Sequence, residues 1–123
     1  MIGGILSLDM IKDKPLKERL FLCMYCAESQ AKFDAKASEI IRERQNKLHG
    51  FWSDDWDENA VSQIRHFNAD MSAEIGTYCT LKMLYESEFD DIDAMEKTIE
   101  KLADEMAEDM LVKFGWKEKG EEK

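Results

Sequence analysis

The chain has 123 residues, which is the size of one domain and too few for two well-packed ones. Apolar residues make up 44% of the chain and can supply one core, whereas charged residues make up 36%, above the usual share of about a quarter. The net charge of −10 argues against a protein that binds nucleic acid or anionic membranes, because such proteins present a positive surface. One proline and six glycines exclude collagen-like chains and turn-rich β folds.

The first twelve residues form an apolar arm that fits neither a helix nor a strand completely. The arm has no basic region, and Asp9 interrupts its apolar stretch early, so it does not resemble a secretory leader. No segment approaches the run of about 18 apolar residues that a transmembrane helix requires. The three cysteines, an odd number, favour free thiols. We therefore expect a cytoplasmic protein with reduced cysteines.

The spacing of apolar residues predicts a first long helix over residues 14–48. Pro15 suits the first turn of a helix, and Gly50 is expected to end the helix in a left-handed conformation. The phase of the pattern shifts between Phe33 and Ala37, where we expect a bend or a change of packing partner. The predicted core positions are Leu16, Leu20, Cys23, Met24, Ala27, Ala31, Phe33, Ala37, Ile40, Ile41 and Leu48.

Two further helices are predicted, over residues 57–87 and 91–114. Asp55 and Glu58 have the spacing of a capping box at the start of the second helix, and Gly115 is expected to end the third. The predicted core positions are Ala60, Ile64, Phe67, Met71, Ile75, Tyr78, Leu81 and Tyr85 in the second helix, and Ile92, Met95, Ile99, Leu102, Met106 and Met110 in the third.

The predicted fold class is all-α, because these helices cover most of the chain and no strand pair with a hairpin signal occurs. Short connections make neighbouring helices antiparallel. We expect a single domain over residues 1–123, built as an antiparallel bundle of three long helices. The N-terminal arm covers residues 1–12, and residues 116–123 form a frayed tail.

The most acidic part of the chain lies between residues 86 and 109, where eleven acidic residues and two lysines give a charge of −9. Four of these acids recur every four residues and form a line along one side of the third helix, with Glu105 beside it. Like charges at this spacing destabilise a helix, which favours a functional role. One interpretation is a surface complementary to a cationic protein groove, such as one that holds nucleic acid; the other is a solvent-exposed face. The line consists of Glu96, Glu100, Asp104 and Glu108.

The segment between the first two helices, residues 50–56, combines three large aromatic side chains with two acids. In one interpretation Phe51 and Trp56 close the end of the bundle. In the other, the aromatic side chains form an exposed anchor for a partner, as in many interface hot spots. The candidate binding residues of this segment are Phe51, Trp52, Asp54, Asp55 and Trp56.

The carboxylates of the third helix also permit a metal site. Glu105-x-x-Glu108, preceded by Asp104, resembles part of the EExxE stretch of all-α nucleotide pyrophosphohydrolases, which use Mg²⁺. The ExxD that follows this stretch in that family has no counterpart before the tail. We therefore predict neither a metal ion nor a cofactor.

The sequence contains no recognisable catalytic set. Cys23-x-x-Cys26 lies inside the first helical pattern, so we expect buried structural cysteines rather than a redox or zinc site. Neither His49 nor His66 has a nucleophile at an interpretable spacing, which disfavours a catalytic dyad.

These features predict a small, acidic, non-enzymatic protein that binds a protein target with a basic surface and inhibits or modulates it, without direct contact with nucleic acid or membrane. In size, acidity and lack of catalytic motifs the chain resembles immunity proteins, antirestriction proteins and phage-encoded inhibitors. One alternative is a Mg²⁺-dependent all-α nucleotide pyrophosphohydrolase. Another is a structural or chaperone-like subunit that forms a homodimer or larger homo-oligomer through its methionine-rich third helix.

Overall fold

The computed structural model describes residues 11–51 and 53–118 and confirms the all-α fold class. Its helices are α2 (Leu16–His49), α3 (Glu58–Glu88) and α4 (Ile92–Lys113). Each begins and ends within two residues of its predicted bounds. Most of the predicted N-terminal arm and the end of the tail lie outside the described residues. None of these three helices is both long enough and apolar enough to span a membrane.

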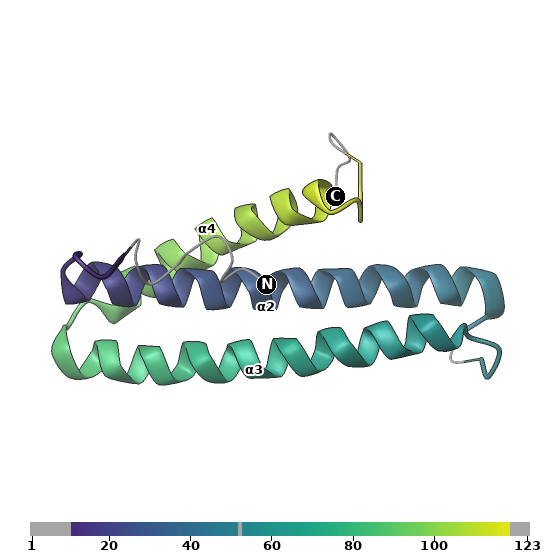
Figure 1. Ribbon diagram of the computed structural model, residues 1–123, viewed down its shortest axis with the longest axis horizontal. Coiled ribbons are helices and arrows are strands. Elements are labelled where there is room, and N and C mark those ends of the chain that lie inside the picture. Colours follow the sequence, from purple (N-terminus) through teal and green to yellow (C-terminus); the bar gives the residue numbers. More distant parts are fainter. Residues whose placement is uncertain (1–10, 52, 119–123) are drawn as a thin grey trace.

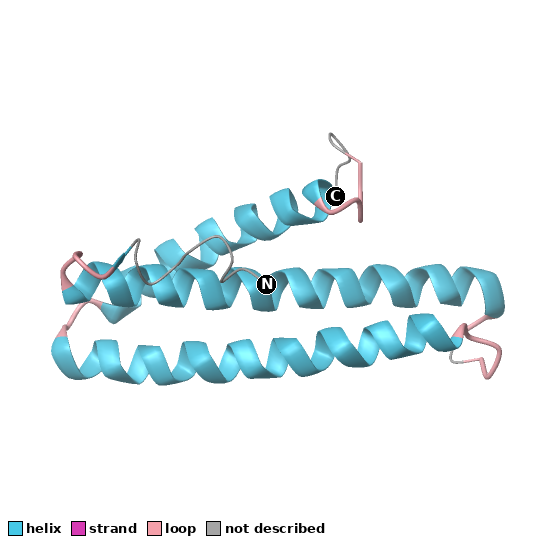
Figure 2. Cartoon of the chain, in the orientation of Figure 1, coloured by secondary structure: helices cyan, strands magenta, loops and turns pink. Residues whose placement is uncertain are grey.

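The central element is α2, which contacts both other helices. α3 runs antiparallel along one side of α2, while α4 packs against another side of α2 and diverges from α3 toward its C-terminal end (Figures 1 and 2). The backbones of α3 and α4 make few contacts with each other, and their side chains meet mainly near the turn that joins the two helices. Beyond this turn the bundle is more open, and α2 supplies most of the packing surface.

The apolar core consists of three clusters spaced along α2. Near its start α2 packs against both partners, in its middle mainly against the second half of α4, and near its end against the beginning of α3. This change of partner agrees with the phase shift in the sequence around Phe33. The clusters are Leu20, Met24, Tyr85, Met95 and Ile99; Phe33, Ala37, Ala107, Met110 and Leu111; and Ile41, Ala60 and Ile64.

Three of the predicted core positions are wrong, because Leu16, Leu48 and Ile75 are exposed. Leu16 and Leu48 lie at the two ends of α2, and Leu48 keeps 71% of its surface accessible. Ile75 is 45% exposed because α3 has a close neighbour on one side only. A periodic pattern marks the apolar side of a helix but does not say how far a neighbouring helix extends along it.

Both glycines that were predicted to end helices have positive φ angles. Gly50 ends α2 with φ +93° and ψ 159°, so its φ is as predicted but its backbone is extended rather than left-handed helical. Gly115 follows α4 with φ +83°. There the Trp116 amide donates to the Leu111 carbonyl at 2.7 Å and the Gly115 amide donates to Val112 at 3.1 Å, the two bonds of a Schellman motif.

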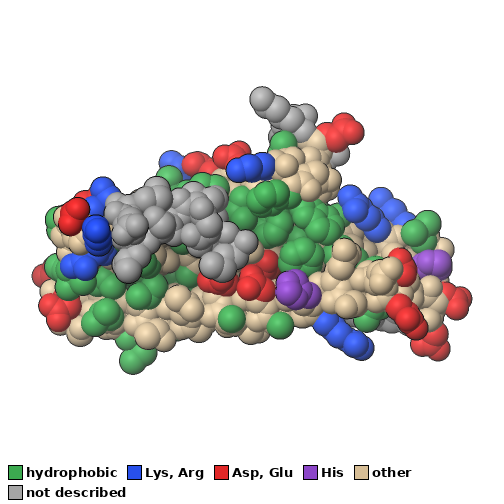
Figure 3. Space-filling model, in the orientation of Figure 1, with side chains coloured by type: hydrophobic (Ala, Val, Ile, Leu, Met, Phe, Trp, Pro, Cys, Tyr) green, Lys and Arg blue, Asp and Glu red, His purple; other side chains and the backbone are tan. Residues whose placement is uncertain are grey.

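This reversal after α4 returns the chain to the core. The rings of Phe114 and Phe33 meet edge to face with centroids 5.7 Å apart, and Phe67 of α3 contacts both Phe33 and Trp116 in the same way, at 6.0 and 5.6 Å. Figure 3 shows apolar side chains gathered between α4 and α3 on this face. The aromatic contacts bridge the opening that the tilt of α4 leaves.

The predicted capping box at the start of the second helix is wrong. α3 begins at Glu58, and its cap is Asp57, whose carboxylate accepts from the Asn59 amide at 3.1 Å. The Asp57 amide in turn donates to the buried side chain of Gln45 in α2, at 2.8 Å. This contact across the helix pair selects Asp57 rather than Asp55, and nothing in the local sequence indicates it.

Candidate functional site

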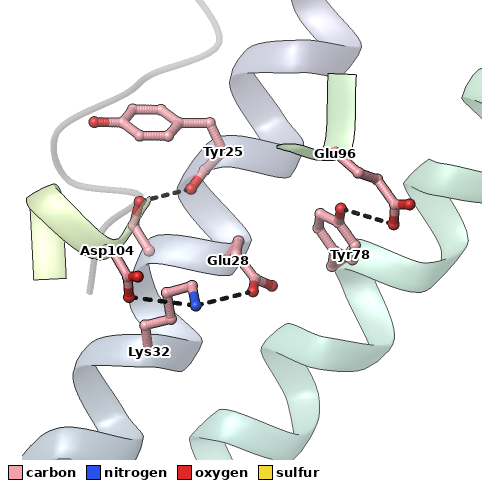
Figure 4. A network of polar contacts seen from close by, with 7 residues as sticks. Tyr25, Glu28, Lys32, Tyr78, Glu96 and Asp104 are labelled. Carbon is pink, nitrogen blue, oxygen red and sulfur yellow. Dashed lines mark hydrogen bonds and ion pairs between the residues drawn. The ribbon is translucent and has the colours of Figure 1, made fainter. Parts of the chain in front are cut away.

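The predicted acidic line runs along the side of α4 that borders α2 and α3, and most of its carboxylates have internal partners. Glu96 accepts from the hydroxyl of Tyr78 at 3.2 Å and pairs with Lys82 at 2.8 Å, both from α3. Asp104 pairs with Lys32 of α2 at 3.4 Å (Figure 4). These acids therefore help to hold α4 beside the other helices.

The last member of the line is similarly engaged. Glu108 pairs with Lys117 at 2.7 Å and with Lys36 of α2 at 3.1 Å, and these two lysines hold the pKa of its carboxyl below the ordinary value. Glu100 and Glu105, by contrast, are exposed and make no ion pair within residues 11–51 and 53–118. Of the five predicted acids, Glu100 and Glu105 are therefore the two that could bind a partner without first breaking an ion pair among the described residues.

A cavity of about 430 Å³ opens where the three helices meet beside this line. We call it the acidic notch; it is lined by Glu28 of α2, by Asp93, Glu96, Lys97 and Glu100 of α4, and by Tyr78 of α3. Its four carboxylates outnumber its one lysine.

The electrostatics of the acidic notch are visible in the titration of Glu28. Burial raises the pKa of this carboxyl, and the neighbouring carboxylates of Glu100, Asp104 and Glu96 raise it further, against the opposing effect of Lys32 at 3.8 Å. Burial and the adjacent Glu96 likewise raise the pKa of the Tyr78 hydroxyl. The notch is therefore a place of excess negative potential that the internal lysines only partly neutralise.

In the aromatic segment, residues 50–56, one ring closes the end of the bundle and another is exposed, so each of the two predicted roles applies to a different residue. Trp56 is half-buried against the cluster of Ile41, Ala60 and Ile64, and its indole donates to the Gly50 carbonyl at 2.9 Å. Phe51 is 73% exposed. Trp56 thus closes the end of the helix pair, whereas Phe51 presents its ring to solvent. Asp54 and Asp55 are exposed beside it, and Trp52 lies outside the described residues.

The structure does not bring the acidic line and the aromatic segment together. Glu108, the last member of the line, pairs with Lys36 of α2, which lies 14 positions before Gly50. At 1.5 Å per residue this is about 21 Å. The surface between them is of mixed charge and includes Arg44 and Lys47. The two sets of predicted binding residues therefore form separate patches.

Asp34 is a buried acid that the sequence pattern did not single out. It is 1% exposed between α2 and α3, and its Oδ1 accepts from the side chain of Gln30 at 3.0 Å. Its Oδ2 has no hydrogen-bond donor within the described part of the chain. Burial, together with the neighbouring carboxyl of Asp70 in α3, raises the pKa of Asp34 to about 8, although the hydrogen bond from Gln30 opposes the shift. The carboxyl of Asp34 therefore stays largely protonated at neutral pH.

The structure gives little geometric support to a metal site or to a reactive cysteine pair. Within the described residues no three His, Cys, Asp or Glu side chains are arranged to hold a metal ion. Cys23 and Cys26 are half-buried, and burial raises the pKa of Cys26 to about 11, which keeps it a thiol. Cys79, the third cysteine, is exposed on α3.

The burial of Asp34 has a counterpart in the sequence, although the spacing of apolar residues alone does not reveal it. Gln30, Asp34 and Ser38 follow one another at helical spacing on a second side of α2, and all three are buried. A row of polar residues at helical spacing, lying between two rows of apolar residues, is typical of a helix that neighbouring helices cover on two sides.

Comparison of the chain with models of known protein families, with curated proteins and with solved structures found no significant match.

Proposed function

We propose that this chain is a small non-enzymatic protein that binds a basic surface of a protein target and thereby inhibits or modulates it. The observation that carries the proposal is the acidic notch. Its volume of about 430 Å³ is ample for the end of one lysine or arginine side chain, and its carboxylates come from two helices, α2 and α4. Charge-assisted hydrogen bonds to such a cation are among the strongest polar contacts in proteins.

The electrostatics of the acidic notch favour binding of a cation from the target. Burial raises the pKa of Glu28, and the neighbouring carboxylates raise it further, so the negative charges of the notch repel one another. A cation from the target would relieve this repulsion, and desolvation of the closed site would strengthen the contact. The net charge of −10 would in addition steer a basic target toward the protein.

Phe51 supports a second and separate contact. Phe51 is exposed and follows the end of α2, about 33 Å along this helix from Glu28 in the notch. A target that covers both would contact the protein along much of its length. Exposed aromatic side chains frequently act as anchors at protein interfaces.

The test begins with capture of the target from a native lysate and continues with association kinetics. Replacing Glu100 by lysine should slow association by about tenfold at low salt and make the rate less dependent on salt, because charge complementarity acts mainly on the association rate. Glu100 is exposed and unpaired within the described residues, so the variant should stay folded.

The matched control is Glu88→Lys, which makes the same charge change at an exposed position at the end of α3, outside the notch and away from Phe51. It should slow association much less. Phe51→Ala should instead raise the dissociation rate, by an amount worth about 1–2 kcal/mol. If Glu100→Lys and Glu88→Lys slow association equally, overall charge rather than the notch attracts the target and the proposal fails.

A further inference from the structure

The side of α3 that faces away from α2 differs from the rest of the surface because it has no charge over a long stretch. Between Arg65 and Lys82 the only charged residues are Asp70 and Glu74, and both act on the buried Asp34 of α2. The outer face of this stretch is therefore uncharged, in a chain of which 36% is charged. In Figure 3 the visible edge of α3 is correspondingly mostly apolar or neutral.

This outer face exposes large apolar side chains. Ile75, Met83 and Leu84 keep 45%, 69% and 46% of their surface accessible, and they account for three of the seven large hydrophobic side chains that are exposed in the described residues. At 100° per residue Met83 lies near the centre of the outer face, with Ile75 and Leu84 on its two flanks. A surface helix of a monomer does not need this arrangement.

Gly76 lies at the centre of the same face, and no contact within the described part of the chain requires a glycine there. A Cβ atom at this position would meet no atom of another described segment within 4 Å, so the described structure leaves room for a side chain. Glycine in the middle of a helix is also unfavourable for helix stability. Ala69, Ala73, Gly76, Thr80 and Met83 follow one another at the alternating spacing of four and three residues that a paired helix requires. A second helix approaching closely would account for this choice of residues.

We propose that the outer face of α3 binds α3 of a second copy of this chain, with the two helices antiparallel and crossing near Gly76. The charges at the ends of the face select this occupant and this direction. Arg65 lies at one end and Glu86 at the other, 21 residues or about 31 Å apart, and neither makes an ion pair within the described residues. Antiparallel pairing places each Arg65 near Glu86 of the second copy, whereas parallel pairing would place like charges together.

The size of the face predicts a reversible dimer. Residues 65–87 extend over about 33 Å, and a helix is about 10 Å wide, which gives about 300–400 Å² per copy. Stable protein interfaces bury about 800 Å² per partner. The proposed dimer should therefore dissociate on dilution through the micromolar range. It uses a different surface from the acidic notch and does not depend on the function proposed above.

Sedimentation velocity on the reduced full-length chain tests the proposal. Between about 5 and 500 µM the wild-type protein should shift from monomer to dimer. Gly76→Lys should abolish the shift, while its thermal midpoint should rise or stay unchanged, because lysine is a better helix former and has room in the monomer. Ala35→Lys, the same charge at an exposed position of α2, should leave the dimer intact. A wild-type protein that stays monomeric throughout, or a dimer that survives Gly76→Lys, would overturn it.

A charge-exchange cycle tests the direction of pairing. Arg65→Glu and Glu86→Arg should each weaken the dimer at least tenfold, and the double variant should recover most of the loss. Because the two positions lie about 31 Å apart along one helix, recovery cannot arise within a monomer. If the double variant is as weak as the single variants, the antiparallel arrangement is wrong.

Discussion

Replacing Asp34 by asparagine should stabilise the protein at pH 8 and remove most of the pH dependence of its unfolding between pH 5 and 8. Asp34 is 1% exposed and holds its proton up to about pH 8, because burial and the facing Asp70 both oppose its ionisation. Asparagine has the same shape as the protonated carboxyl and its amide can donate toward Asp70. The variant therefore keeps the packing and removes the charge.

The direction of the effect follows from the two pKa values. The carboxyl of Asp34 titrates near 3.8 in an unfolded chain and near 8 in the native protein. Between these values the native protein binds the proton and the unfolded chain does not, so the free energy of unfolding falls as pH rises. The slope is at most about 1.4 kcal/mol per pH unit for one proton. Burial also raises the pKa of Glu28 and Glu74, which adds to the slope in the same direction.

Urea unfolding at pH 5, 6, 7 and 8 measures this effect. At pH 8 we expect Asp34→Asn to gain about 2 kcal/mol or more over the wild-type protein, with little difference at pH 5. Glu39→Gln, which removes one exposed carboxylate from the same helix, controls for the overall charge of −10. A wild-type stability that stays constant or increases from pH 5 to 8 would show that Asp34 ionises normally.

Replacing Tyr85 by alanine should destabilise the protein by about 3–5 kcal/mol, the range for truncating a large aromatic core residue. Tyr85 is fully buried where α2, α3 and α4 meet, among Leu20, Met24, Met95 and Ile99. Its hydroxyl donates to Asp91 at 2.6 Å, and Asp91 pairs with Lys17 of α2 at 2.9 Å. One side chain thus packs all three helices and orients the turn before α4.

Two milder variants separate packing from polar contacts at this position. Tyr85→Phe keeps the ring and removes only the hydrogen bond, so we expect a loss of about 1 kcal/mol. The hydrogen bond from Tyr85 and the contact with Lys17 lower the pKa of Asp91, so their contribution is present at neutral pH and is lost as pH falls through that pKa. Urea unfolding at pH 7 distinguishes the variants. Equal losses for Tyr85→Phe and Tyr85→Ala would contradict a packing role for the ring.

The sequence predicted the helices closely because their ends carry local signals. Pro15, Gly50 and Gly115 act within one turn of chain, and the apolar spacing of α4 corresponds to one buried side, with Met95, Ile99 and Met110 all buried. Burial on α2 was harder to predict because this helix is covered on two sides. Its second side is made of small and polar residues, which hydrophobic periodicity does not weigh.

The candidate site could be predicted only in part, because its chemistry depends on contacts between helices. The acidic line is evident in the sequence, but Lys32, Lys36 and Lys82 approach it from other helices. The same limit applies to the acidic notch, since Glu28 is far in sequence from Glu96 and Glu100. The exposed ring of Phe51 and the half-buried ring of Trp56 likewise differ through tertiary contacts rather than residue type.

The shared role of α2 has a consequence for how the protein unfolds. Because α3 and α4 each pack mainly on α2 and make few backbone contacts with each other, α4 can detach while the α2–α3 hairpin stays formed. Detachment would expose the buried side chains of α4 and break its ion pairs with α2 and α3, a smaller loss than global unfolding, which would also expose the contacts between α2 and α3. Native-state hydrogen exchange should therefore show the amides of α4 opening as one unit, at a lower free energy than those in the middle of α2.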